Sequence, residues 1–450
     1  MSELLSPRKA ALLAVLRARR AGTAGGAGPA GTIRPVTGDE PPVASAAQRQ
    51  MWYLDRAAPG EPAYLAPVAW RLRGPLDTAA LAAAVDALVA RHEPLRTTLT
   101  TVDDQPVPVV GEPWPGLLRL VDLSTDTGTP RGAGATREAD LADRLAAEAA
   151  TPIDLAHGPV LRATLFRLDP ADHTLVLTFH HAAVDEWSLR VVADERAELY
   201  AAGRAGRQPR LPALPVRYRD YAAWQRRWLT GPEAAAQCDW WRDQLAGAPP
   251  VLELPTGRTR PAVPSSAGTT TRHPLHLPVE AVRALCRRLN VTPYLLLLAA
   301  FQVLLARVTG QYDVPVGTPV ANRNRPETEP LVGLFVNTLV IRTDLADDPT
   351  FEELVARVRA TVLAARERQE LPFARLVEEL RPERAPGHTP LFQVMFVHAD
   401  APAPLRLDGL DAEPVELPAG TAKFDLTVAV RPGPESFEAV VEARTDLFDA

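Results

Sequence analysis

The stretch from residue 175 to residue 200 shows two successive hydrophobic patterns. Residues 175–179 are apolar and partly β-branched, a short run typical of a strand that is buried on both faces. From Ser188 onward, leucines and valines recur at nearly helical spacing among Arg, Asp and Glu, and Ser188 is a suitable N-cap. The pattern therefore predicts a strand, a tight turn and a helix.

Hydrophobic periodicity predicts further elements before this segment. We expect helices at 45–54, with Ser45 as the cap, at 77–92 and at 139–150, strands at 68–73 and 160–168, a hairpin formed by 95–101 and 105–110, and a surface loop at 124–134. The strand at 160–168 is expected to pair antiparallel with the strand before His180.

A similar set of elements is expected after the segment. Helices are predicted at 218–229, 232–246, 279–288, 292–308, 350–368 and 373–380, and strands at 275–277, 313–319, 336–342, 393–398, 424–431 and 437–444. Because helices and strands do not alternate regularly, the fold class predicted is α+β, with two similar lobes. We divide the chain into a helix and linker at 1–33, an N-terminal lobe at 34–229 and a C-terminal lobe at 230–450.

Composition narrows the class of protein. The chain has 450 residues, 46% hydrophobic and 23% charged, which is typical of a soluble globular protein of two domains or lobes. The net charge of -6 and the absence of dense Lys/Arg blocks argue against nucleic-acid binding. No apolar run approaches the length of a membrane span, and the first twenty residues do not fit a signal peptide. Cys238 and Cys286 are isolated, which indicates neither a disulfide framework nor a metal site and suits reduced thiols in the cytoplasm.

The predicted turn contains His180, His181 and Asp185, and these are the only adjacent histidines in the chain. Histidine is the side chain best suited to exchange a proton near neutral pH, and a nearby carboxylate can fix its tautomer or hold the loop. Histidines at a strand end are also common as structural residues. Residue type and spacing alone therefore leave both a catalytic and a structural role open.

Seven stretches, taken in order, resemble the motifs of nonribosomal peptide synthetase condensation domains. They are residues 45–54, 91–97, the HHxxxD core at 180–185, 218–224, 332–338 followed by Arg342, 369–373 and 390–396. Their order, spacing and total span, from residue 45 to the end of the chain, agree with that family.

The resemblance implies a V-shaped pseudo-dimer of two chloramphenicol-acetyltransferase-like lobes with a central tunnel. Donor and acceptor carrier proteins would dock at the two tunnel mouths and insert phosphopantetheine arms. The acceptor amine would attack the donor thioester, so the expected enzyme is an acyltransferase that forms amide bonds. No metal or diffusible cofactor is implied.

The resemblance also implies neighbours outside the chain. Adenylation and carrier domains are expected downstream, and the last residues resemble a segment that the family continues with one more helix, so the chain would be a piece of a larger protein. At the other end, residues 7–20 would form either a docking helix or a simple packing helix.

Roles in the predicted site follow from the same resemblance. His181 is expected to point into the tunnel and either take the ammonium proton or hydrogen-bond the amine and the tetrahedral intermediate, whereas His180 is structural. Asp185 is expected to pair with an arginine of the other lobe, with Arg323 as the first candidate and Arg342 as the second. A helix-start carboxylate at Asp185, favoured by the helix dipole, is equally compatible.

Three further residues complete the predicted site. Trp187 and Ser188 face the same turn, and we expect Ser188 to cap the helix rather than touch substrate. Asn337 either lines the tunnel or has a structural role at a strand end.

Glu186 is a departure from the family pattern, which has glycine after HHxxxD. Glycine would permit a positive φ or a close backbone approach that glutamate tolerates poorly, so we expect an altered turn or an additional carboxylate at the tunnel mouth. Two alternatives to ordinary condensation remain: a catalytically altered or silent domain that serves as a docking platform for a partner enzyme, and an ester-forming variant.

Overall fold

The computed structural model describes residues 31–36, 40–124, 133–383, 385, 387–399, 405–417 and 420–449. The predicted helix at 7–20, the part of the linker up to residue 30 and most of the predicted loop at 124–134 lie outside these residues. The helices are α2 (Ala46–Ala57), α3 (Thr78–Arg91), α4 (Ala133–Ala150), α5 (Glu186–Arg204), α6 (Tyr218–Trp228), α7 (Pro232–Leu245), α8 (Val279–Leu289), α9 (Pro293–Thr309), α10 (Phe351–Arg366) and α11 (Phe373–Leu380), with short 3-10 turns η2 (Pro62–Tyr64), η3 (Glu93–Arg96) and η4 (Pro326–Thr328).

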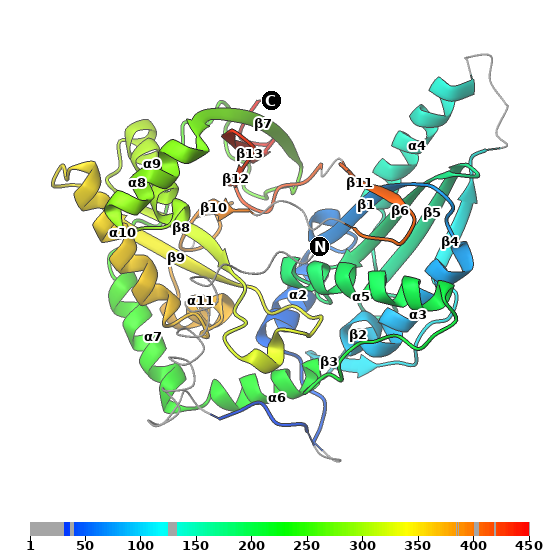
Figure 1. Cartoon of the computed structure of the whole chain (residues 1–450). Coiled ribbons are helices and arrows are strands. Elements are labelled where there is room, and N and C mark those ends of the chain that lie inside the picture. Colours follow the sequence, from blue (N-terminus) through cyan, green and yellow to red (C-terminus); the bar gives the residue numbers. More distant parts are fainter. Residues whose placement is uncertain are drawn as a thin grey trace.

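Four strands of the first half and one of the second form a sheet, on the right of Figure 1, with the order β11-β1-β6-β5-β4. Its members are β1 (Leu65–Arg73), β4 (Leu118–Asp122), β5 (Leu161–Asp169), β6 (Asp172–His180) and β11 (Asp411–Val415), and a separate hairpin joins β2 (Thr97–Val102) to β3 (Gln105–Val110). Strands β5 and β6 pair antiparallel, as predicted.

The first sheet is covered on both faces, which explains the uninterrupted apolar run in β6. Val176 packs with Leu141 and Leu145 of α4, whereas Leu175 and Leu177 belong to a second cluster that includes α3 and α5. Successive strand residues point to opposite faces, so a strand covered twice has no polar face to alternate with. The prediction of a strand buried on both faces is confirmed.

Strands of the second half form a six-stranded sheet with the order β7-β13-β12-β10-β8-β9, on the left of Figure 1. These are β7 (Gly268–Pro278), β8 (Asp313–Val320), β9 (Asn337–Asp344), β10 (Val394–His398), β12 (Leu426–Pro432) and β13 (Ser436–Arg444). Helix α9 buries nine of its 17 residues and packs on β8 and α10. No single described helix is long and apolar enough to cross a membrane, and α8 with α9 meets that test only as a pair bent by 97°.

The two halves exchange elements. Strand β11 comes from the second half of the sequence and pairs antiparallel with β1 of the first sheet. Helix α6 precedes residue 229, yet Tyr221, Trp224 and Trp228 belong to the core of the second sheet. Sheet and core membership therefore cross the predicted division at residue 229.

Candidate active site

The turn after β6 begins the candidate site, and Asp185 caps the helix that follows. Asp185 has extended backbone angles, its side chain accepts a hydrogen bond from the Ser188 N–H, and α5 starts at Glu186. The prediction that Ser188 is the N-cap is wrong, because a carboxylate three residues earlier already satisfies the free N–H groups of the first turn. Ser188 lies inside the first turn and is fully buried.

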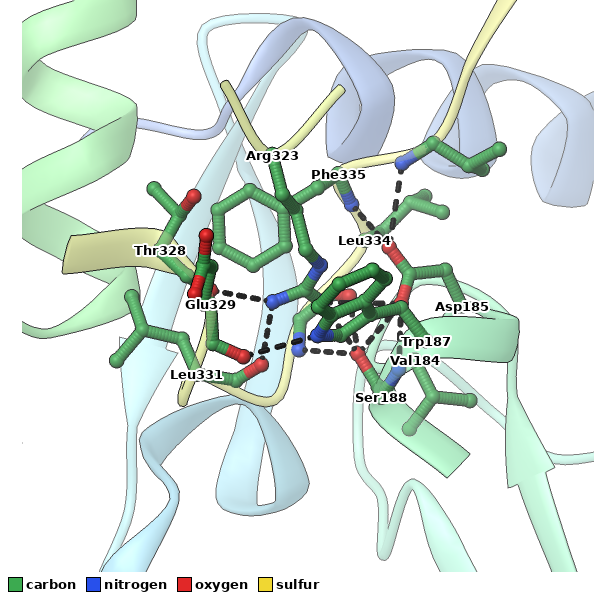
Figure 2. Close-up of polar contacts among 12 residues, drawn as sticks. Val184, Asp185, Trp187, Ser188, Arg323, Thr328, Glu329, Leu331, Leu334 and Phe335 are labelled. Carbon is green, nitrogen blue, oxygen red and sulfur yellow. Dashed lines mark hydrogen bonds and ion pairs between the residues drawn. The ribbon is translucent and has the colours of Figure 1, made fainter. Parts of the chain in front are cut away.

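Asp185 also pairs with Arg323 of the second half, so the two roles considered for this carboxylate coexist. Arg323 Nη2 lies 3.0 Å from Asp185 Oδ1, and both side chains are nearly inaccessible to solvent. The other carboxylate oxygen accepts the N–H groups of Phe335 at 2.9 Å and Val336 at 3.2 Å. Figure 2 shows these groups converging on the carboxylate. Such complete pairing is what allows a charge to remain in a protein interior.

Arg323 connects α5 to the segment after β8. Its Nη1 donates to the carbonyl groups of Thr328 and Leu331 at 2.5 and 2.7 Å, and Nη2 reaches the Ser188 hydroxyl at 2.8 Å. The guanidinium carbon lies 4.1 Å from the centre of the Phe335 ring. Burial lowers the pKa of Arg323, while the Asp185 carboxylate opposes that shift. Both terminal nitrogens of the planar guanidinium donate hydrogen bonds, an arrangement that the single ammonium group of a lysine could not reproduce.

Trp187 makes a further contact between the two halves. Its side chain is 37% exposed, and the indole N–H donates to the carbonyl of Glu329 at 2.9 Å. Figure 2 shows the ring lying beside Arg323. Trp187 therefore covers the ion pair from the solvent side.

Arg342 is not the partner of Asp185. It lies on β9 and pairs with Asp313 of the adjacent β8, with Nη2 2.7 Å from Oδ2. It also donates to the carbonyl groups of Gln244 and Ala246 at the end of α7. The second candidate was wrong because the sequence does not show which strand lies next to β9.

Asn337 fastens a loop of the second half. Its Nδ2 donates to the carbonyl groups of Gln369 and Leu371, both at 2.8 Å, and its Oδ1 accepts the N–H of Phe373 at 2.9 Å. The side chain is buried. Of the two roles left open by the sequence, these contacts favour the structural one.

Three of the sequence motifs meet behind the ion pair. The Tyr218 hydroxyl donates to the Leu334 carbonyl at 2.7 Å and lies 2.9 Å from the Ser45 hydroxyl. A Cβ on Gly333 would lie 2.1 Å from the Tyr218 ring, so only glycine fits there. These contacts hold the segment that carries the backbone donors to Asp185.

His181 is held in one tautomer. Its backbone N–H donates to the Tyr64 carbonyl at 2.8 Å, and its ring Nδ1 lies 2.6 Å from the Val184 carbonyl. A carbonyl only accepts, so Nδ1 carries the hydrogen and Nε2 presents a lone pair. Burial, followed by the charge of Lys423, lowers the pKa of His181 to about 4, so the ring is neutral at pH 7.

His180 has a different environment. It is 4% exposed, and its Nδ1 accepts the N–H of Ala182 at 3.0 Å. Burial, followed by His181 and Lys423, lowers the pKa of His180 to about 3. These contacts fit the structural role predicted for this residue.

Lys423 was missed from the sequence, although it influences both histidines. It precedes β12, and its Nζ lies 5.5 Å from the centre of the Tyr64 ring, on the 3-10 turn that contacts His181. One signal was available: among 49 basic residues, only Lys9 and Lys423 are lysines.

Glu186 occupies an ordinary helical position. It is the first residue of α5, it is not among the described residues with positive φ, and its side chain, 69% exposed, lies 3.4 Å from Arg190 one turn later. Glu186 thus needs no positive φ, because the first position of a helix suits any L residue and favours an acidic one, and the expected altered turn or additional carboxylate at the tunnel mouth stays a prediction. No group of three or more potential metal ligands occurs among the described residues.

Comparison with known proteins agrees with this geometry. The family model described as "Condensation domain" matches residues 40–450. One subunit of the linear gramicidin synthase of Brevibacillus parabrevis is 42% identical over 93% of this chain, which spans 5% of that protein. A solved complex of the X-domain and OxyB from teicoplanin biosynthesis superposes with a TM-score of 0.83 at 30% identity, covering 93% of this chain and 91% of that one.

The fold is shared with more distant structures. The first condensation domain of the calcium-dependent antibiotic synthetase superposes with a TM-score of 0.74 at 20% identity, covering 91% of this chain and 92% of that one. The predicted α+β fold class with two chloramphenicol-acetyltransferase-like lobes is confirmed. This chain belongs to the condensation domain family of nonribosomal peptide synthetases.

Proposed function

We propose that this chain forms an amide bond between a donor acyl or peptidyl thioester and an acceptor aminoacyl thioester. The observation that carries this proposal is the tautomer of His181. With Nδ1–H held by the Val184 carbonyl at 2.6 Å, Nε2 is a neutral hydrogen-bond acceptor. Such an acceptor can receive a hydrogen bond from the attacking amine and so direct the lone pair of the amine nitrogen toward the thioester.

The reaction transfers one acyl group. The amine nitrogen attacks the thioester carbonyl carbon, a C–N bond forms, and the π electrons of the carbonyl move onto its oxygen. His181 Nε2 stays neutral and accepts a hydrogen bond from the N–H whose proton nitrogen must lose. Collapse of the tetrahedral intermediate breaks the C–S bond, and the departing thiolate takes up that proton. Because the thioester is a good electrophile and the amine a fair nucleophile, the main task of the protein is to position the two groups.

The substrates would arrive on the phosphopantetheine arms of donor and acceptor carrier proteins, through the tunnel between the lobes. The network of Asp185 and Arg323 supports this arrangement, because it joins the His181 turn to the other half of the molecule. The proposal also includes adenylation and carrier domains, which would belong to the same synthetase as this chain and work with it in the cytoplasm.

The test is product formation on the acceptor arm, measured by mass spectrometry with purified, loaded carrier proteins. We expect His181→Ala to lower the rate by about a hundredfold or more. His157→Ala is the matched control, because this histidine is 83% exposed and pairs only locally with Asp154. The control should react like the wild type.

Two outcomes would contradict the proposal. Equal rates for wild type and His181→Ala would remove His181 from the reaction. A wild-type protein that binds its carriers or another enzyme but forms no product would favour the docking platform, a role suggested by the relative solved in complex with OxyB. Replacement of the acceptor amine by a hydroxyl tests the ester-forming alternative.

A further inference from the structure

Lys423 influences His181, and among the described residues its ammonium forms no ion pair, although the charge of Glu442 acts on it. The described contact of its Nζ is with the Tyr64 ring, whose centre lies 5.5 Å away. The carboxylate of Glu442 instead accepts the backbone N–H of Lys423 at 3.3 Å. The ammonium is therefore available to act on whatever enters the space next to it.

Lys423 is an exposed residue that nevertheless has many protein atoms around it. The residue keeps solvent-exposed area, yet burial lowers its pKa, with Glu442 opposing the shift. His181 has the same combination of accessible area and a pKa lowered by burial. Both side chains therefore reach solvent although many protein atoms lie around them.

Tyr64 fixes the geometry between the two residues. Its carbonyl accepts the His181 N–H at 2.8 Å, while the face of its ring holds the Lys423 ammonium. Lys423 comes from the second half of the chain and Tyr64 from the first, so the cation reaches across to the element that supports His181. The face of the aromatic ring attracts the cation, and this attraction partly offsets the loss of hydration.

We propose that Lys423 is an electrostatic positioning residue, which keeps His181 and the acceptor amine in their neutral, reactive forms and attracts the negative charge that develops on the thioester oxygen. This inference rests on the proposed function. A positive charge in this space opposes a second one on imidazole or on the amine. The same charge favours the oxyanion of the tetrahedral intermediate.

The charged and titratable neighbours of His181 identify Lys423 as the group to change. His180 is neutral there, because its own pKa is about 3, and Asp185 is already paired with Arg323. Glu442 acts on Lys423 rather than on the ring. Removal of the lysine charge therefore alters the field at His181 without removing a ligand of the ring.

The first readout does not depend on activity. In protein labelled at the histidine ring carbons, NMR titration follows the His181 signal, which His181→Asn assigns. We expect Lys423→Met to raise the His181 pKa from about 4 by about one unit, and Lys423→Arg to leave it nearly unchanged. Lys423→Gln, which keeps a polar side chain, should behave like Lys423→Met and serves if the methionine variant does not fold.

The second readout is the reaction with loaded carriers at pH 7. We expect Lys423→Met to be about tenfold slower and Lys423→Arg to keep most of the rate. If the His181 pKa is the same in the wild type, Lys423→Met and Lys423→Gln, the inference is wrong, whatever the rates. If the wild type forms no product while the pKa shift is observed, the proposed function fails but the electrostatic pairing stands.

Discussion

Arg196 is a buried cation that forms no ion pair among the described residues. Its relative exposure is 0%, and none of its three guanidinium nitrogens has a hydrogen-bond partner there. The guanidinium carbon lies 4.6 Å from the centre of the Trp70 ring, the one favourable contact that compensates for lost hydration. Removal of a charge from water without pairing it costs several kcal/mol in typical proteins.

We therefore expect Arg196→Met to stabilise the protein. Methionine fills a similar volume against Trp70 and has no charge to desolvate, so the free energy of unfolding should rise by about 2 kcal/mol. The measurement is the denaturant midpoint followed by tryptophan fluorescence.

Arg71→Met is the matched control, because Arg71 follows Trp70 on β1. Arg71 pairs with Asp172 and with Glu138, so the same substitution there should lower the midpoint. A lower midpoint for Arg196→Met as well would show that the Trp70 contact outweighs the desolvation of Arg196.

Single residues also show how far the site could be predicted from sequence. Arg323 was identified because the family motif supplied its role, and the ion pair with Asp185 confirms that contact. Ser188 and Arg342 were assigned wrongly, since which carboxylate caps a helix and which strands are neighbours depend on the folded arrangement. Lys423 stands 242 positions after His181 in sequence, and no periodicity links such distant residues.

At the scale of elements, the start of α5 determines where the His181 turn ends. Glu186 occupies the first helical position, with its carboxylate near the positive end of the helix dipole and 3.4 Å from Arg190. Glycine at this position would increase the backbone entropy of the unfolded state and remove the favourable charge.

We expect Glu186→Gly to lower the free energy of unfolding by about 1 kcal/mol and to leave product formation no faster than in the wild type. Denaturation and the carrier assay measure the two effects. Glu186→Gln, which removes the charge alone, should have a stability between those of the wild type and Glu186→Gly. A faster glycine variant would mean that the glutamate obstructs the reaction.

Long elements were predicted well because their periodicity is strong. Helices α3, α6, α9 and α10 begin or end within a few residues of the predicted bounds. Strands β4 and β11 were missed: β4 is short and mostly exposed, and β11 contains Pro414 among acidic residues. Edge strands of this kind receive their conformation from the neighbouring strand, so their own sequence carries little signal.

At the scale of the whole molecule, each core contains residues from the other half of the chain. Val332, Leu334, Leu405 and Leu407 pack in the cluster of the first sheet, and the aromatic face of α6 packs in the cluster of the second. The hydrophobic core of each lobe is therefore complete only when the other half of the chain is present.

Residues 34–229 expressed alone should consequently fail to unfold cooperatively. This fragment would lack β11 and would expose the aromatic residues of α6, so we expect an aggregation-prone species that binds a hydrophobic dye. The full chain is the control, and co-expression with residues 230–450 should restore a cooperative transition. A sharp transition in the isolated fragment would show that the N-terminal lobe is an independent folding unit.

The scarcity of lysine gives the molecule an unusual chemical property. Because Lys9 and Lys423 are its only lysines, a Lys9→Arg variant would leave one ε-amine in the entire chain. Reductive methylation with isotopically labelled formaldehyde would then mark that amine and the amino terminus alone. Its NMR signal would act as a resident probe beside Tyr64, reporting the arrival of an acyl thioester without a fluorophore, a redesigned site or a full set of resonance assignments.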